Sequence, residues 1–222
     1  MTQTYVKEKF EYRKIIESAA TFTDLAFEQC AFVGGVIMQE HDDPTYPLAL
    51  SNISLHKCKV GNVVLYGLRC DNVVVDTLSH GKPIEFEACV FDRVTFRGSL
   101  GAVRFSPAID EEPRKSFAPG AAKLYEEIDW ALDITEAEFS DIEIWDVPGH
   151  LVKRDPETQF LVRRATAAAA DIDALPPYAR VLVERAAEAP YDTSVLAAPI
   201  RSKSFEEALD ALRTLRDLGI AE

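Results

Sequence analysis

Apolar residues in the first half of the chain recur in pairs at a period of five, and this period constrains the fold more than any other feature. One residue separates the two members of a pair, and the next pair begins three positions later. The central block reads Ile53/Leu55, Cys58/Val60, Val63/Leu65, Leu68/Cys70 and Val73/Val75. A helix repeats every 3.6 residues and a plain strand every two, so neither explains the pattern. It predicts short strand-like sides, each followed by a corner, with four sides closing a coil of about 20 residues.

The same phase recurs on both sides of the central block. Further pairs are Ala20/Phe22, Leu25/Phe27, Cys30/Phe32, Gly35/Ile37, Leu48/Leu50, Ile84/Phe86, Cys89/Phe91, Val94/Phe96, Gly98/Leu100, Val103/Phe105, Leu132/Ile134, Ala137/Phe139 and Ile142/Ile144. Stacking such coils at about 4.8 Å gives a parallel sheet wound around an apolar interior. The sequence therefore predicts a mainly β plus α fold, in which a right-handed parallel β-solenoid of about five coils occupies 1–147.

The repeat resembles that of the pentapeptide-repeat family, whose units have a small residue at the first inward position and Leu or Phe at the second. Ala20/Phe22, Cys30/Phe32, Cys89/Phe91 and Ala137/Phe139 fit this rule. Ile53/Leu55 and Val73/Val75 are bulkier, and the Asp or Asn between the inward residues is mostly missing, so the chain resembles a degenerate member. The resemblance covers about 20–105 and 132–147. It implies a right-handed quadrilateral β-helix, a fold that does not by itself specify a function.

The repeat also assigns places to the cysteines and to three asparagines. Cys30, Cys58, Cys70 and Cys89 all fall at inward positions, which predicts small buried fillers rather than the two disulfides that four cysteines allow. Asn52, Asn62 and Asn72 each precede an inward pair. Asn52 and Asn72 are one coil apart in the sequence, so we expect them to stack at one corner, where Asn tolerates turn conformations.

Two stretches interrupt the phase. The first, 38–47, contains two prolines and predicts a loop pushed out from a corner. His41, Asp42 and Asp43 within it could bind a metal, but three neighbouring polar residues on a loop are more often simply solvated, so no metal site is predicted. The second, 106–131, predicts a loop followed by a short helix over 121–131.

The C-terminal region, 148–222, is predicted to be helical. Asp155-Pro156-Glu157 indicates a helix start, with the helix running to Ile172. A second helix is expected over 178–188, and the third begins with a capping box at Ser204 and ends at Gly219. These helices would cover the apolar end of the solenoid, and the last one could instead form a homodimer.

Negative charge is concentrated at the end of the repeat. Residues 107–146 contain three basic and twelve acidic residues, a net charge of −9 out of −13 for the whole chain. The candidate partner-binding residues are Glu126, Asp129, Asp133, Glu136, Glu138, Asp141, Glu143, Trp145 and Asp146. Trp145 would be either an interface anchor or a cap on the interior. Such an acidic patch disfavours nucleic acid as a direct ligand and favours a basic protein partner, although acidity can also serve solubility alone.

Catalytic signatures are absent. The chain has no nucleophile elbow, phosphate-binding glycine loop, zinc-protease motif or CxxC pair, so no catalytic residue and no cofactor is predicted. No apolar run approaches the roughly 20 residues that span a bilayer, and 1–17 lacks the apolar core of a signal peptide. We therefore expect a cytoplasmic protein that does not bind membranes.

Three functional hypotheses follow from these observations. The first is a non-enzymatic binding module that neutralises a basic partner, as toxin-immunity proteins do. The second follows from the family resemblance, because some pentapeptide-repeat proteins mimic DNA and bind DNA gyrase. The third is a scaffold or adaptor. The acidic residues separate them, since a DNA mimic should carry charge along the whole rod.

Overall fold

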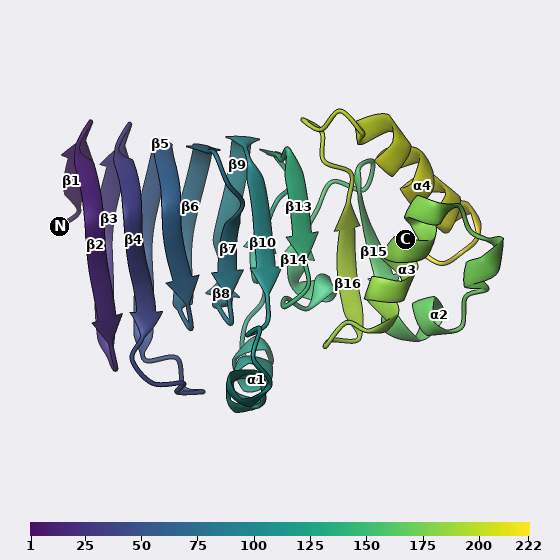
Figure 1. Ribbon diagram of the computed structural model, residues 1–222, viewed down its shortest axis with the longest axis horizontal. Helices are drawn as coiled ribbons and strands as arrows, with labels where there is room; N and C mark the ends of the chain where they lie inside the picture. The colour runs from purple at the N-terminus through teal and green to yellow at the C-terminus, as the bar shows by residue number, and fades with distance from the viewer.

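The computed structural model describes residues 1–222 and consists mainly of one parallel sheet with a C-terminal unit at its end (Figure 1). About 46% of the residues are in strands, there are four α-helices, and the sheet curls through 276°. Its fourteen strands are β1 (Gln3–Val6), β2 (Lys9–Glu17), β3 (Ala20–Glu28), β4 (Ala31–Gln39), β5 (Leu48–Tyr66), β6 (Arg69–His80), β7 (Ile84–Glu87), β8 (Val90–Asp92), β9 (Val94–Leu100), β10 (Ala102–Ser106), β11 (Leu132–Asp133), β12 (Ala137–Glu138), β13 (Asp141–Ile144) and β14 (Val152–Lys153).

The remaining elements lie between and after these strands. They are α1 (Glu111–Tyr125), β15 (Gln159–Arg163), α2 (Arg164–Ala168), α3 (Pro177–Ala187), β16 (Thr193–Ala197), α4 (Phe205–Asp217) and two single 3-10 turns at Gly149–Leu151 and Ile172–Ala174. We refer to residues 154–222, which carry the antiparallel pair β15–β16 and its helices, as the C-terminal unit.

The strand register follows the period of the sequence. Leu50 of β5 pairs with Cys70 of β6, one coil later in the sequence, and Cys70 pairs with Phe91 of β8. Where a segment is inserted, the paired residues lie farther apart in the sequence. Phe22 of β3 pairs with Leu50 across the 40–47 loop, and Ala102 of β10 pairs with Asp141 of β13 across α1. The predicted parallel sheet wound around an apolar interior is confirmed. The two predicted interruptions lie outside it except at their first residues, since β4 extends to Gln39 and β10 to Ser106.

A left-handed backbone conformation recurs at the corners. Positive φ angles fall on every fifth residue of the longest run, at Asn52, Lys57, Asn62, Gly67, Asn72 and Thr77. Such a conformation is unfavourable for most side chains, and Asn and Gly adopt it most readily. At one corner the Asn72 amide donates a hydrogen bond to the Asn52 side chain at 2.7 Å, and Asn52 donates to Asp24 at 3.3 Å. The predicted stacking of Asn52 and Asn72 is therefore confirmed.

The sheet begins earlier than the sequence pattern indicated. The paired repeat starts at Ala20, but β1 and β2 already continue the sheet, with Tyr5 paired to Phe27 and Ile15 paired to Ile37. The signal was present as single apolar residues, Tyr5, Phe10 and Ile15, at the same spacing of five. The first inward position of each pair holds Gln3, Glu8 or Arg13, so only the second, apolar member of each pair was visible.

The predicted inward residues line the interior of the sheet. All four cysteines are free and buried, as expected of small core residues. The Cys30 thiol lies 3.4 Å from the Tyr5 carbonyl and the Cys58 thiol lies 3.3 Å from that of Phe27. Burial raises the pKa of Cys70 to about 12, so its reactive thiolate form is suppressed near neutral pH.

The 106–131 insertion contains a longer and earlier helix than predicted. α1 begins at Glu111, well before the expected start at 121, and ends at Tyr125. Pro113 lies in the first turn, where a missing N–H loses no hydrogen bond, so proline did not mark a loop there. The helix packs on the 40–47 loop, where Ser116 donates a hydrogen bond to the Asp42 carbonyl at 2.9 Å. A β-carbon at Gly120 would overlap the Pro44 carbonyl oxygen, so only glycine permits this approach.

The predicted helix from Asp155 to Ile172 is wrong. Residues 159–163 form β15, which pairs antiparallel with β16, and only the five residues of α2 are helical beyond it. The Asp155 carboxylate accepts bonds from the Glu157 N–H at 3.1 Å and the Thr158 hydroxyl at 2.8 Å, which closes a turn rather than starting a helix. β15 is buried on both faces, so its sequence lacks the alternation of apolar and polar residues that indicates a strand with one exposed face.

The other two C-terminal helices occur where they were predicted, as α3 and α4. Ser204 makes no side-chain capping bond, so the expected capping box is not formed. The apolar face of α4 is buried inside the C-terminal unit, through Leu209, Leu212 and Leu215. The surface that suggested a homodimer is therefore already covered by the chain itself.

The C-terminal unit is attached to the last strands of the sheet by buried polar contacts. The Gln159 amide donates to the Ile134 carbonyl at 3.0 Å, and the Arg201 guanidinium donates to the Leu100 carbonyl at 2.7 Å. The unit thus covers the end of the sheet, which is the arrangement that exposed repeat ends require.

We predict that Gln39→Leu destabilises the protein by about 2–3 kcal/mol, because it leaves buried backbone groups without partners. Gln39 is 1% exposed, donates to the Gly67 carbonyl and accepts from the Asp43 N–H at 2.9 Å, so it connects the 40–47 loop to the corner between β5 and β6. Urea unfolding followed by circular dichroism measures the change. Gln3→Leu, at an exposed position, is the matched control. Equal stability of the two variants would contradict this role of Gln39.

Candidate functional site: an acidic ring at the end of the sheet

The candidate acidic residues encircle the end of the sheet instead of sharing one face. Asp133 lies on β11, Glu138 on β12 and Asp141 on β13, which are successive sides of the curled sheet. Their pairing partners, Thr95, Ser99 and Ala102, follow one another along β9 and β10 in the same way. The residues that the sequence groups as a patch therefore form a ring.

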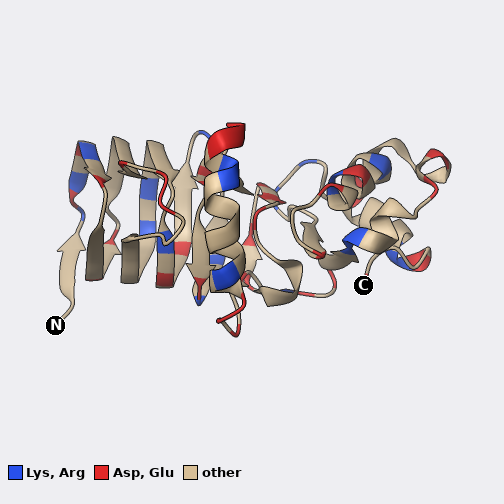
Figure 2. Ribbon diagram, turned by 90° about the horizontal axis from the view of Figure 1, so that it is seen from below, with Lys and Arg blue, Asp and Glu red and all other residues tan.

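Most carboxylates of this ring carry no partner. No cationic side chain lies within 4.0 Å of the carboxylates of Glu126, Asp129, Asp133, Glu136, Glu138 and Asp141. All of these side chains except Asp133 are exposed. Asp133 is half-buried and accepts the Thr135 N–H at 3.1 Å. In Figure 2, acidic segments lie on the loops between the sheet and the C-terminal unit, whereas α1 carries both acidic and basic segments.

Glu143 differs from the other members, because it is neutralised within the protein. Its carboxylate lies 2.9 Å from Arg185 of α3 and 3.7 Å from Arg104 of β10. These contacts join the sheet to the C-terminal unit. Glu143 therefore has a structural role, and its charge is not available to a partner.

Three of the candidate residues line a small groove between β13 and the C-terminal unit. Asp141, Glu143 and Trp145 face Tyr178 and Arg185 of α3 across a cavity of about 120 Å³. Trp145 is half-buried in this wall, so it is neither a fully exposed anchor nor a cap on the interior of the sheet.

Asp146 lies among aromatic residues and is not part of the exposed ring. Burial raises the pKa of its carboxyl to about 7, and the positive charge of Arg114 opposes this only in part. Burial likewise raises the pKa of Tyr191, and the buried hydroxyls of Tyr46 and Tyr125 have no hydrogen-bond partner. Asp146 is therefore placed to affect stability rather than binding.

We predict that Asp146→Asn stabilises the protein at pH 8 and has little effect at pH 3.5. The pKa of Asp146 is raised in the folded state, so the fold retains a proton that the unfolded chain releases above about pH 4. This contribution to stability is complete below pH 4 and is lost as the pH rises to about 7. The variant should gain on the order of 2–4 kcal/mol over the wild type at pH 8.

Thermal unfolding of both proteins across this pH range measures the difference. Asp141→Asn, an exposed neighbour without an ion pair, is the matched control and should show no such pH dependence. A constant difference between Asp146→Asn and the wild type at all pH values would refute the assignment.

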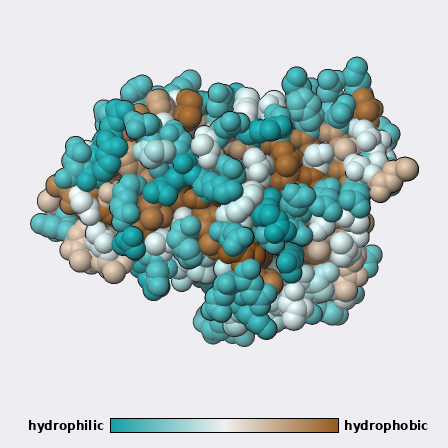
Figure 3. All heavy atoms as spheres, turned by 180° about the vertical axis from the view of Figure 1, so that it is seen from behind, coloured by the Kyte–Doolittle hydropathy of each residue, from teal (hydrophilic) through white to brown (hydrophobic).

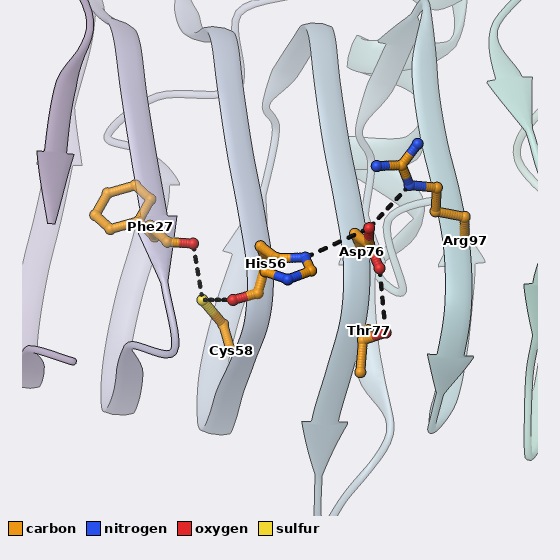
Figure 4. Close-up of polar contacts among 6 residues, drawn as sticks. All are labelled: Phe27, His56, Cys58, Asp76, Thr77 and Arg97. Atoms are coloured by element: carbon orange, nitrogen blue, oxygen red, sulfur yellow. Dashed lines mark hydrogen bonds and ion pairs between the residues drawn. The ribbon is translucent and has the colours of Figure 1, made fainter. Parts of the chain in front are cut away.

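Sequence reasoning missed a charged ladder on another side of the sheet (Figure 4). Asp76 accepts a hydrogen bond from Arg97 at 3.0 Å and one from Thr77 at 3.1 Å, and lies 3.4 Å from the His56 imidazole. Burial by itself would raise the pKa of Asp76, but the bonds from Thr77 and Arg97 bring it below its usual value. His56, Asp76 and Arg97 are spaced about one coil apart in the sequence. Since residues at that spacing become neighbours in the sheet, the spacing could have predicted this ladder.

A second set of ion pairs lies beside it. Arg93 contacts Asp71 at 2.6 Å and Asp92 at 3.4 Å, and Arg69 lies 3.9 Å from Asp92. Acidic residues on this part of the sheet are thus paired with arginines, in contrast to those of the acidic ring.

The remaining sequence candidates do not assemble into a site. No group of three or more residues of the kinds that bind metals is clustered anywhere in the chain. In the 40–47 loop the Asp43 carboxylate accepts bonds from the Thr45 N–H and hydroxyl at 2.8 and 2.7 Å, which shapes the loop. None of the helices has the length and apolar character needed to cross a membrane.

Comparisons with known proteins found no family model, no curated protein and no solved structure that matches this chain.

Proposed function

We propose that the curled sheet is a right-handed quadrilateral solenoid of about five coils, built from degenerate pentapeptide repeats. Three observations support this proposal. The inward pairs recur at a period of five, left-handed corner residues recur at the same period, and strands pair with strands about one coil later. The solenoid supplies a rigid frame whose outward side chains are fixed in space.

On this frame, we infer that the protein is a non-enzymatic, cytoplasmic binding module that neutralises a basic protein partner. The observation that carries the inference is the ring of exposed carboxylates without cationic neighbours. Salt screens interactions between exposed charges beyond about 8 Å, so the carboxylates of one arc of the ring act together most strongly. Their combined field would steer a cationic partner and disfavour anionic ones.

The distribution of unpaired charge favours neutralisation of one partner over DNA mimicry. A mimic should present negative charge along the whole rod, but Asp71, Asp76 and Asp92 on the main part of the sheet are paired with arginines. The net negative charge is concentrated near one end, because residues 1–106 carry 11 basic and 13 acidic residues, whereas 107–146 carry three basic and twelve acidic ones. A toxin-immunity protein that blocks a basic, nuclease-type toxin fits this arrangement best. Binding to DNA gyrase and a scaffold role are the alternative outcomes of the test below.

We predict that neutralising one arc of the ring weakens partner binding without affecting the fold. Two variants divide the ring. The first carries Glu126→Gln, Asp129→Asn, Asp133→Asn and Glu136→Gln, and the second carries Glu138→Gln and Asp141→Asn. The control removes four exposed, unpaired charges elsewhere, through Glu184→Gln, Glu188→Gln, Glu206→Gln and Asp217→Asn. One ring variant should weaken binding at least tenfold, since several charge contacts of about 1 kcal/mol each are lost.

The measurement is affinity capture from a native lysate of the source organism, followed by titration calorimetry with the purified partner at two salt concentrations. A basic protein that binds the wild type and the control, is released by salt and is lost with one ring variant supports the proposal. Capture of a type II topoisomerase, weakened by both ring variants, would establish mimicry instead. A partner that binds all variants equally would refute a role for the ring.

A further inference from the structure

The first part of the curled sheet encloses a large apolar cavity. Its volume is about 390 Å³, and 24 of its 27 lining residues are hydrophobic. The lining runs from Tyr5, Phe10 and Ile15 on β1 and β2 to Phe91 and Phe96 near the middle of the sheet. These residues occupy five successive strand levels, so the cavity is about 19 Å long at the usual spacing of 4.8 Å.

The cavity is open at its N-terminal end and closed at the other. Inward residues of the early strands, such as Phe22 and Phe27, remain half-buried although they point into the sheet. Further along, Phe91, Phe96 and Phe105 are each only 1% exposed. Their rings pack edge to face, with Phe91 and Phe105 at 5.1 Å and Phe96 and Phe105 at 5.6 Å. This aromatic cluster forms the floor of the cavity. Apolar side chains also reach the surface over the N-terminal half of the sheet, the right half of Figure 3.

One charged residue lies at the mouth. Arg13 is the only charged side chain of the lining, and in the register of the sheet it occupies the position of Gly35 and Val63, which are inward residues. The Arg13 guanidinium makes no ion pair or hydrogen bond. Gly35 on the next strand has no side chain to fill the space beside Arg13, and a β-carbon there would lie 2.8 Å from the Arg13 carbonyl oxygen. Arg13 is exposed to solvent, and an unpaired positive charge beside an apolar cavity complements the anionic headgroup and the apolar tail of an amphiphile.

We propose that this cavity binds an amphiphile with an unbranched apolar tail and an anionic headgroup, the tail lying in the cavity and the headgroup on Arg13. The volume falls within the range of about 300–1,000 Å³ that is typical of small-molecule sites. Arginine binds carboxylates and phosphates through paired, charge-assisted hydrogen bonds. A narrow, elongated apolar cavity selects a flexible chain over a flat or polar molecule. This site is independent of the acidic ring, which lies at the opposite end of the sheet.

The test measures binding of fatty acids to the purified full-length chain after delipidation. Titration with saturated carboxylates from octanoate to hexadecanoate should show affinity rising about fourfold per methylene until the cavity is full, after which it levels off. Anionic phospholipid vesicles form a second arm, which distinguishes a membrane lipid as the source of the headgroup from a free amphiphile. Absence of binding in both arms would overturn the proposal, leaving a dry cavity.

Variants then test the placement of the ligand. Arg13→Gln should lower the affinity for dodecanoate at least tenfold but leave that for 1-dodecanol, which has no charge, unchanged. Lys14→Gln, which removes the neighbouring exposed charge, is the matched control and should bind both as the wild type does. Val63→Phe should fill the cavity and weaken both ligands equally, with circular dichroism confirming the fold.

Two results would refute this placement of the ligand. One is equal loss of both ligands in Arg13→Gln, and the other is a Lys14→Gln effect of the same size. If light scattering instead shows that two copies associate through this end and that fatty acids do not dissociate them, the cavity is a protein interface and the proposal is wrong. The comparison of dodecanoate and 1-dodecanol affinities in Arg13→Gln remains a valid test even if Val63→Phe does not fold.

Discussion

Every level of this structure depends on the five-residue side and its left-handed corner. A side buries two residues and then must turn, and the turn requires a backbone conformation that disfavours most side chains. Asn52, Gly67 and Asn72 meet this requirement with suitable residues, whereas Lys57 and Thr77 adopt it under strain from the fold. The stacking of inward pairs, such as Leu50 on Cys70, stabilises all the corners together, because a slip at one corner would shift every later side.

The same geometry decides what the surface can do. Outward residues about one coil apart become neighbours, and this brings Asp76 between His56 and Arg97 to form a neutral ladder. Outward residues close in sequence are separated instead, because consecutive sides face different directions. Asp133, Glu138 and Asp141 thus form a ring, and a partner can contact only an arc of it. A net charge counted along the sequence overstates the charge that a single binding face presents.

The period predicted the parallel sheet, its inward residues, the buried cysteines and the stacked asparagines, because one strict pattern determines them all. It failed where tertiary packing outweighs local signals. Pro113 is compatible with the first turn of α1, so it did not mark a loop, and the Asp155 carboxylate closes a turn where a helix start was expected. The acidic residues were found by composition, but their arrangement was not. The neutralisation of Glu143 by Arg185 depends on a contact between distant segments that no local pattern encodes.

The two ends of the sheet differ because only one of them is covered. At the C-terminal end, Gln159 and Arg201 satisfy carbonyls of the last strands, and Leu161 and Val195 join the main core. At the N-terminal end no element of the chain covers Tyr5, Phe10 and Ile15, and the interior is open. An uncovered apolar interior at a sheet edge promotes aggregation unless a ligand covers it or a charged residue opposes the approach of another chain. The exposed Arg13 lies beside this opening. We infer that its positive charge discourages stacking of another sheet edge and offers a counterion to the proposed anionic headgroup.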